Sequence, residues 1–309
     1  MQVEHEVPVD AVPDQVWALA RTTAALSALP FRFAFDVPGD VPGTSRLCCL
    51  LTDIRTVIPT VHDVRQEIAG QMICWQTRST RPAGQQTLTL AVRPRPGGST
   101  LRLSVSDVVP KLHAIVYQAY WQTQVRAWAS SLRGIAEGRA PRPSPEIPGR
   151  TREKCSVPRQ LNNPVHVSAT AVIHAPAAAV WEAVYAPESL PLIAPGEVAY
   201  AGRVPGTPER KAGEMQYVVR RHPDERFTAN VSVVTDVVHG VSAVTQGVSP
   251  PHLKIFHLLT PVADGTRLEL ECRWPAPASK TAAENEAADA ARQLREDVEG
   301  YKALIEKRA

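Results

Sequence analysis

The stretch Val7–Leu29, VPVDAVPDQVWALARTTAALSAL, decides the fold because its pattern occurs twice in the chain. It aligns without gaps on Ala171–Ile193, AVIHAPAAAVWEAVYAPESLPLI, so that Trp17 falls on Trp181. In both copies an alternating strand leads through a turn into a helix that carries the tryptophan on its apolar face. Such self-similarity predicts two copies of one domain.

A second correspondence lies at the other end of each copy. The segment QVRAWASSLRGI, which begins at Gln124, matches QLREDVEGYKAL, which begins at Gln293. The apolar helical stripe is kept while the surface residues differ, so that Leu132 falls on Tyr301. Because both ends match, we expect each copy to be a complete domain that ends in a helix.

The segment between the copies is rich in proline, which is typical of a stiff, extended linker. A long loop inside one domain is the alternative, but structureless loops of that length are uncommon in compact domains. We therefore predict domain 1 over residues 1–137, a linker over 138–164 and domain 2 over 165–309.

The order of patterns within each copy is typical of the α+β class, with strands first and one long helix last. In the first copy the expected strands cover residues 46–52, 71–79, 85–92 and 100–107, and the helix covers 112–137. In the second copy they cover residues 165–173, 214–221, 227–235, 237–245, 252–260 and 266–274, with helices over 177–185 and 279–307. A curved antiparallel sheet wrapped around a long helix leaves a cavity where the facing side chains are small.

The composition excludes several classes of function. Lys and Arg number 34 and Asp and Glu 31, which is too even a balance for a nucleic-acid-binding protein. The start has no secretion signal and no stretch reaches about 18 apolar residues, so we expect a cytoplasmic protein that does not span a membrane. The five cysteines form no C-x-x-C pair, which fits a reducing compartment.

Four features together resemble a known family. They are the motif A-x-x-x-x-V-W at Ala11–Trp17 and Ala175–Trp181, the strand ICWQTRS at Ile73–Ser79, the hairpin PVADGTRLELEC at Pro261–Cys272, and the long terminal helices. The chain resembles the helix-grip superfamily, which includes START lipid-transfer domains, birch-pollen-allergen-like proteins and bacterial polyketide cyclase/dehydrases. As a tandem pair it is similar to the didomain aromatase/cyclases of bacterial aromatic polyketide pathways.

The resemblance implies an enzyme of antibiotic biosynthesis that encloses a hydrophobic polyketide intermediate, delivered by an acyl carrier protein, and promotes its cyclisation or dehydration without a cofactor. The segment Leu47–Val61, LCCLLTDIRTVIPTV, departs from the more polar, charge-alternating hairpin of that family. Two alternatives stay open: a non-catalytic carrier of a hydrophobic ligand, and a structural didomain with collapsed cavities. The sequence fits a monomer or a homodimer.

Domain 1 offers five candidate substrate contacts. His113, Tyr117 and Trp121 are spaced by one helical turn, and such a wall can stack on planar rings. Core packing is the alternative for this aromatic stripe, and a surface position is the alternative for His113. Strand alternation puts Trp75 and Arg78 on opposite faces, so Trp75 is expected to line the cavity; an inward Arg78 could hold a carboxylate, whereas an outward one is solvated.

Domain 2 offers the candidate catalytic residues Tyr217, His239 and His257, each of which alternates with apolar neighbours on its expected strand. An imidazole can move the α-proton of a β-keto compound and a tyrosine hydroxyl can donate to the enolate. A hydrogen-bonded core residue is the alternative for each of them. Trp274 is a further candidate substrate contact.

The terminal helix of domain 2 carries small residues on one face at its beginning, Ala283, Ala287 and Ala291, and bulky ones at its end. We therefore expect the larger cavity in domain 2, whereas Tyr117 and Trp121, with Trp75, partly fill the cavity of domain 1. No metal-ligand spacing, nucleophile motif or phosphate-binding loop occurs, so we expect no metal and no cofactor.

Overall fold

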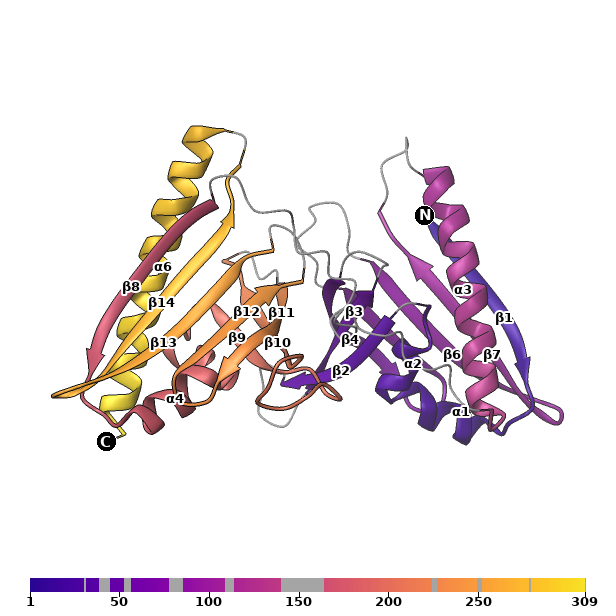
Figure 1. Cartoon of the computed structure of the whole chain (residues 1–309). Coiled ribbons are helices and arrows are strands. Elements are labelled where there is room, and N and C mark those ends of the chain that lie inside the picture. The colour runs from indigo at the N-terminus through magenta and orange to yellow at the C-terminus, as the bar shows by residue number, and fades with distance from the viewer. Residues whose placement is uncertain are drawn as a thin grey trace. The chain divides into compact units, whose positions relative to one another are not determined.

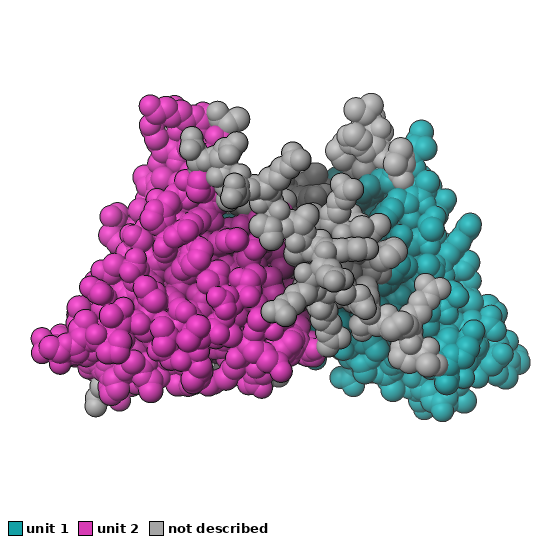
Figure 2. Space-filling view, in the orientation of Figure 1, with its two compact units in different colours: residues 1–147, 222–228 teal, residues 148–221, 229–309 magenta. Residues whose placement is uncertain are grey.

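In the computed structural model the chain forms two compact units, residues 1–147 with 222–228 and residues 148–221 with 229–309 (Figure 2). The structure describes residues 1–30, 32–38, 45–52, 57–77, 86–108, 114–139, 164–223, 227–248, 252–277 and 279–308. Most of the expected linker lies outside these ranges, so the exact domain limits stay a prediction. We keep the names domain 1 and domain 2 for the first and second sheet with their helices.

Domain 1 contains one antiparallel seven-stranded sheet in the order β1-β7-β6-β5-β4-β3-β2. Its strands are β1 (Gln2–Val9), β2 (Arg32–Pro38), β3 (Ser45–Thr52), β4 (Val57–Ile68), β5 (Met72–Thr77), β6 (Thr87–Arg95) and β7 (Gly98–Ser106). Its helices are α1 (Pro13–Ala20), α2 (Thr23–Ser27) and the long α3 (Ala114–Ala136). The long helix packs on β1 and β7 (Figure 1).

Domain 2 repeats this topology with the strand order β8-β14-β13-β12-β11-β10-β9. Its strands are β8 (Pro164–Ile173), β9 (Val198–Arg203), β10 (Met215–Arg221), β11 (Phe227–Val238), β12 (Ser242–Gly247), β13 (Lys254–Val262) and β14 (Gly265–Pro275). Its helices are α4 (Ala177–Tyr185), the 3-10 turn η2 (Pro187–Ser189), α5 (Leu190–Ile193) and α6 (Lys280–Glu306), which packs on β8 and β14 (Figure 1). The α+β class with two tandem helix-grip domains is therefore confirmed.

Hydrogen bonds repeat between the two copies as the sequence match predicts. The Ser99 hydroxyl donates to the carbonyl oxygen of Ala11 at 2.7 Å, and the Thr266 hydroxyl donates to that of Ala175 at 2.8 Å. Both bonds tie the start of the last strand to the turn that precedes the first helix. The duplication therefore extends from the sequence pattern to buried polar contacts.

The end of each terminal helix is fixed by a second repeated contact. A carboxylate oxygen of Glu137 accepts the backbone N–H of Asp10 at 3.1 Å, and one of Glu306 accepts that of His174 at 2.9 Å. In both domains this bond joins the end of the long helix to the residue after the first strand. It fixes which end of the helix approaches which end of the sheet.

Several sequence-based expectations need correction. The strands β2, β4 and β9 were not expected, and the expected single strand over 237–245 is wrong. In the structure β11 ends at Val238 and β12 begins at Ser242, because His239 and Gly240 form a hairpin turn in which Gly240 has a φ of 76°. A positive φ is left-handed backbone that glycine adopts without strain, and it reverses the chain direction.

Candidate functional site

Three tryptophans are buried in the interior of domain 1. Trp75 on β5 is 1% exposed, and Trp121 and Trp128 on α3 are 2% and 0% exposed. All three belong to one apolar core that joins the sheet to the helix. This part of the interpretation holds: Trp75 and Trp121 face inward, but as closely packed core residues.

Domain 2 has small or polar residues at the matching positions. The correspondence of Gln124 with Gln293 places Ala290 where domain 1 has Trp121, and Asp297 where it has Trp128. The buried residues of α6 all lie from Leu294 onward, so the first half of the helix contributes none. The expectation of more room in domain 2 therefore has a residue-level basis.

Asp297 is the distinctive polar residue of this interior. It lies on α6 one turn before Tyr301 and accepts the side-chain N–H of Gln293 at 3.0 Å. Burial raises the pKa of its carboxyl above the usual range, against the lowering effects of the Gln293 bond and of Arg220. A carboxyl group with a raised pKa is a stronger proton acceptor than an ordinary aspartate and can return the proton that it takes.

The groups around Asp297 hold their own protons firmly. Burial, followed by the charge of Asp297, raises the pKa of the Cys272 thiol on β14 to about 12. Burial and the same charge raise the pKa of the buried Tyr301 phenol above its usual value. Cys272 is therefore a thiol and no thiolate nucleophile, while Tyr301 is a neutral hydroxyl that can donate a hydrogen bond.

His257 also faces this interior, from the middle of β13. It pairs with Ala243 on one side and Leu270 on the other, and both are core residues. Its Nδ1 atom is buried without a hydrogen-bond partner among the described residues, and burial lowers the pKa of the imidazole to about 4. The ring is therefore neutral at physiological pH and keeps one nitrogen unused.

The other two candidate catalytic residues lie elsewhere. His239 is exposed in the β11–β12 turn, where its Nδ1 accepts the indole N–H of Trp181 at 3.0 Å. Tyr217 is 6% exposed on β10, and its ring covers Gly202 on the neighbouring strand β9. His239 is thus not the inward strand residue that alternation predicted.

The remaining predicted substrate contacts have mixed placements. Tyr117 on α3 is half-buried and packs against the domain 1 core. Trp274 is buried in the domain 2 core, and its indole N–H donates to a carboxylate oxygen of Glu286 on α6 at 3.1 Å. Arg78 and His113 lie outside the described residues.

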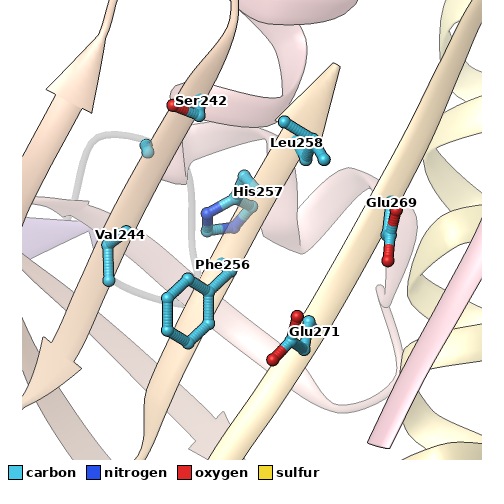
Figure 3. A pocket seen from close by; sticks show the side chains of 8 residues that line it. Ser242, Val244, Phe256, His257, Leu258, Glu269 and Glu271 are labelled. Carbon is cyan, nitrogen blue, oxygen red and sulfur yellow. The ribbon is translucent and has the colours of Figure 1, made fainter. Parts of the chain in front are cut away.

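A shallow groove of about 190 Å³ lies over β12, β13 and β14 of domain 2. Figure 3 shows the eight residues that line it, including Phe256, His257, Glu269 and Glu271. Phe256 and Leu258 alternate with His257 along β13, so they lie on the sheet face opposite the core. The groove is thus an outer feature that borders the strand of His257 and is distinct from the interior around Asp297.

The most buried carboxylate of domain 2, Glu214, is fully committed to local contacts. It accepts the backbone N–H of Arg210 at 2.5 Å, the side-chain N–H of Gln216 at 2.7 Å and the Tyr185 hydroxyl at 3.4 Å. It also pairs with Arg203, whose Nε lies 3.4 Å away. Because these groups occupy its oxygens, Glu214 anchors the loop before β10 and offers no free acceptor.

Sequence reasoning missed Asp297, and it also missed two residues of domain 1, Arg32 and His62. Asp297 adjoins the apolar stripe of α6, next to the buried Val298. The available signal was the comparison of the copies, because an aspartate at the position of a core tryptophan is an unusual replacement. Arg32 and His62 lie on β2 and β4, strands that the periodicity did not reveal.

Within the described ranges, no group of three or more His, Cys, Asp or Glu side chains is arranged to hold a metal ion. In the same part of the chain, no helix is both long and apolar enough to span a membrane.

Two solved structures match nearly the whole chain. The di-domain ARO/CYC StfQ from the steffimycin biosynthetic pathway is 17% identical over 99% of both chains, with a TM-score of 0.39. The di-domain ARO/CYC BexL from the BE-7585A biosynthetic pathway is 17% identical over 98% of both chains, with a TM-score of 0.37. The chain is similar to di-domain ARO/CYC structures. These likenesses concern the fold and leave the chemistry to the residues of this chain.

A further solved structure matches about the length of one domain of this chain. TTHA0849 from Thermus thermophilus is 14% identical over 45% of this chain and 98% of its own, with a TM-score of 0.38. No family model matches the sequence, and no curated protein sequence matches it.

Proposed function

We propose that domain 2 binds a hydrophobic, carbonyl-bearing chain of the polyketide type and promotes its cyclisation or dehydration without a cofactor. The observation that carries the proposal is Asp297, a half-buried carboxyl with a raised pKa, placed in the domain interior where domain 1 has the core residue Trp128. A core that needed only packing would keep an apolar residue there, since an ionisable group is costly to bury.

The chemistry follows from the protonation states of the lining. The Asp297 carboxylate accepts an α-proton flanked by two carbonyl groups, and the resulting enolate forms a carbon–carbon bond to a second ketone of the same chain. The carboxylic acid then returns this proton to the alkoxide. In a dehydration the regenerated carboxylate takes a second α-proton and, as the acid, gives it to the departing hydroxyl group, which leaves as water while the C=C bond forms. The neutral Tyr301 hydroxyl and His257 ring are the groups that can hydrogen-bond the developing oxyanion.

Positioning contributes as much as proton transfer in such a reaction. A flexible chain that binds with its reacting carbons in contact loses its conformational entropy on binding. This entropy loss then no longer adds to the activation barrier of the reaction. Ala290 of α6 is partly buried against the domain 2 core where domain 1 has Trp121, and this smaller side chain supports room for such a chain. An acyl carrier protein is the proposed donor of the substrate.

The test uses a thioester analogue of a linear poly-β-ketone and follows the aromatic product by absorbance and mass. Asp297→Asn keeps the shape and removes the acid-base group, so turnover should fall by about 10²- to 10⁴-fold while analogue binding persists. Asp289→Asn is the matched control, because Asp289 lies on the same helix with its side chain 73% exposed. Unchanged turnover in Asp297→Asn would remove this residue from the mechanism.

A carrier function is the second candidate, and the apolar composition of the lining favours it. The same experiment separates the two, because a carrier binds the analogue and returns it unchanged. Binding without product in the unmodified protein would establish the carrier over the enzyme.

A further inference from the structure

Arg32 is a nearly buried cation without a partner anion among the described residues. It begins β2, is 7% exposed and lies on the same strand face as the core residue Ala34. Its guanidinium carbon lies 5.9 Å from the ring centre of Trp121. Within the part of the chain that the structure describes, no carboxylate pairs with Arg32, although buried charges are normally paired.

His62, whose pKa is influenced by Arg32, cannot supply the missing charge. His62 on β4 is 1% exposed, and its two ring nitrogens lie 3.0 Å from the Thr60 hydroxyl and 3.1 Å from the Thr77 hydroxyl. Burial, followed by the charge of Arg32, lowers the pKa of the imidazole to about 3. The ring is therefore neutral, and the site keeps a net positive charge.

Two further donors in the interior of domain 1 also lack acceptors in the described ranges. The indole Nε1 atoms of Trp75 and Trp121 are buried, and no described residue accepts a hydrogen bond from either of them. Trp121 lies beneath Arg32, and Trp75 lies two residues before Thr77 on the same face of β5. An unsatisfied buried donor costs about 1–3 kcal/mol, so a packed core would avoid having two of them, one of which lies beneath a buried cation.

Solvent reaches this face of the sheet close to the cluster. Val64 follows His62 on the same face of β4, directly opposite Trp75, and is 45% exposed. The matching register of domain 2 places Ser232 and Gly247 where domain 1 has His62 and Thr77. The pairing of histidine with threonine is therefore specific to domain 1.

We propose that Arg32, with the indole N–H groups of Trp75 and Trp121, binds an organic carboxylate in domain 1. A planar guanidinium matches the two oxygens of a carboxylate, and the indoles supply further donors along with an apolar wall for the body of the acid. This site is separate from the interior of domain 2, so it does not depend on the function proposed there.

The first test compares 2-naphthoate with its neutral amide, 2-naphthamide, by isothermal titration calorimetry on the full chain. Naphthoate should bind at one molecule per chain, and naphthamide at least about tenfold more weakly, because it lacks the charge. Arg32→Met should weaken naphthoate binding by about tenfold or more. Arg65→Met is the matched control, since Arg65 is an exposed arginine of β4 that donates to Gln76 at 2.6 Å.

Three results would overturn the site: no saturable naphthoate binding, equal binding of the amide, or full affinity in Arg32→Met. If Arg32→Met does not fold, the site is tested by NMR on the unmodified protein. Naphthoate should then move the indole N–H resonances of Trp75 and Trp121 downfield. Unmoved resonances at saturation would also overturn it. His257→Leu in domain 2 should retain naphthoate binding, which separates this site from the function proposed for domain 2.

Discussion

His257 places a buried imidazole in the core of domain 2, at a position where a polar group costs stability. Domain 1 has Leu90 at the matching position, since Leu90 pairs with Leu103 as His257 pairs with Leu270. A leucine would fill the position without an unused nitrogen. The chain therefore has an imidazole where leucine would pack better, as expected for a residue that contacts a ligand.

This burial predicts an acid-sensitive fold. The pKa of His257 is about 4 in the folded chain and about 6.5 when unfolded, so the unfolded state binds the proton first as pH falls. Stability is full above pH 6.5 and declines between pH 6.5 and 4 by roughly 3 kcal/mol from this residue. Urea unfolding at pH 7.5 and 5 should show a smaller loss for His257→Leu than for the unmodified chain.

The control for that measurement is His166→Gln, because the His166 side chain lies on β8 and is 54% exposed. It should leave the acid-dependent loss in place. An equal loss in His257→Leu and the unmodified chain would show that the imidazole is solvated in the folded state.

At this scale the sequence predicted the inward place of His257, Trp75 and Trp121, because alternation and helical spacing fix the direction of a side chain. It failed for His239, where the chain turns one residue after β11 ends. It also missed Asp297, because no helical rule tells a charged residue at the edge of an apolar stripe from a solvated one.

Between elements, the pairing of β9 with β10 depends on one glycine. Tyr217 lies directly opposite Gly202, and a Cβ atom at Gly202 would lie 2.8 Å from the tyrosine hydroxyl oxygen. Gly202→Ala should therefore displace the ring and lower the free energy of unfolding by about 1–3 kcal/mol. Gly196→Ala, with no atom within 4 Å of its Cβ, should change it by less than about 0.5 kcal/mol in the same urea titration.

Bulges account for the failure to predict β4 and for the wrong end expected for β11. β4 contains a bulge between Val64 and Gln66, and β11 has one at the matching place between Val234 and Asp236. A bulge inserts a residue and breaks the two-residue period on which strand prediction rests. The long helices lack such interruptions, so α6 was predicted to within one residue at each end.

For the whole molecule, the duplicated pattern was enough to predict the fold class, because each copy must bury the same apolar faces against the same elements. The duplication alone does not distinguish the interiors of the two copies. That difference rests on single replacements, Trp121 against Ala290 and Trp128 against Asp297, whose effect depends on what faces them across the domain.

These replacements predict opposite responses from the two domains. Trp121→Ala removes a closely packed ring and should cost about 3–5 kcal/mol of unfolding free energy. Ala290→Trp fills the space proposed for the substrate, so it should cost no more than about 1–3 kcal/mol, abolish binding of the poly-β-ketone analogue and leave naphthoate binding in domain 1 intact. Urea unfolding and calorimetry on both variants test this asymmetry. If Ala290→Trp lowered the free energy of unfolding as much as Trp121→Ala does, the interior of domain 2 would already be full. The carboxyl of Asp297 would then be a buried structural group that contacts no substrate.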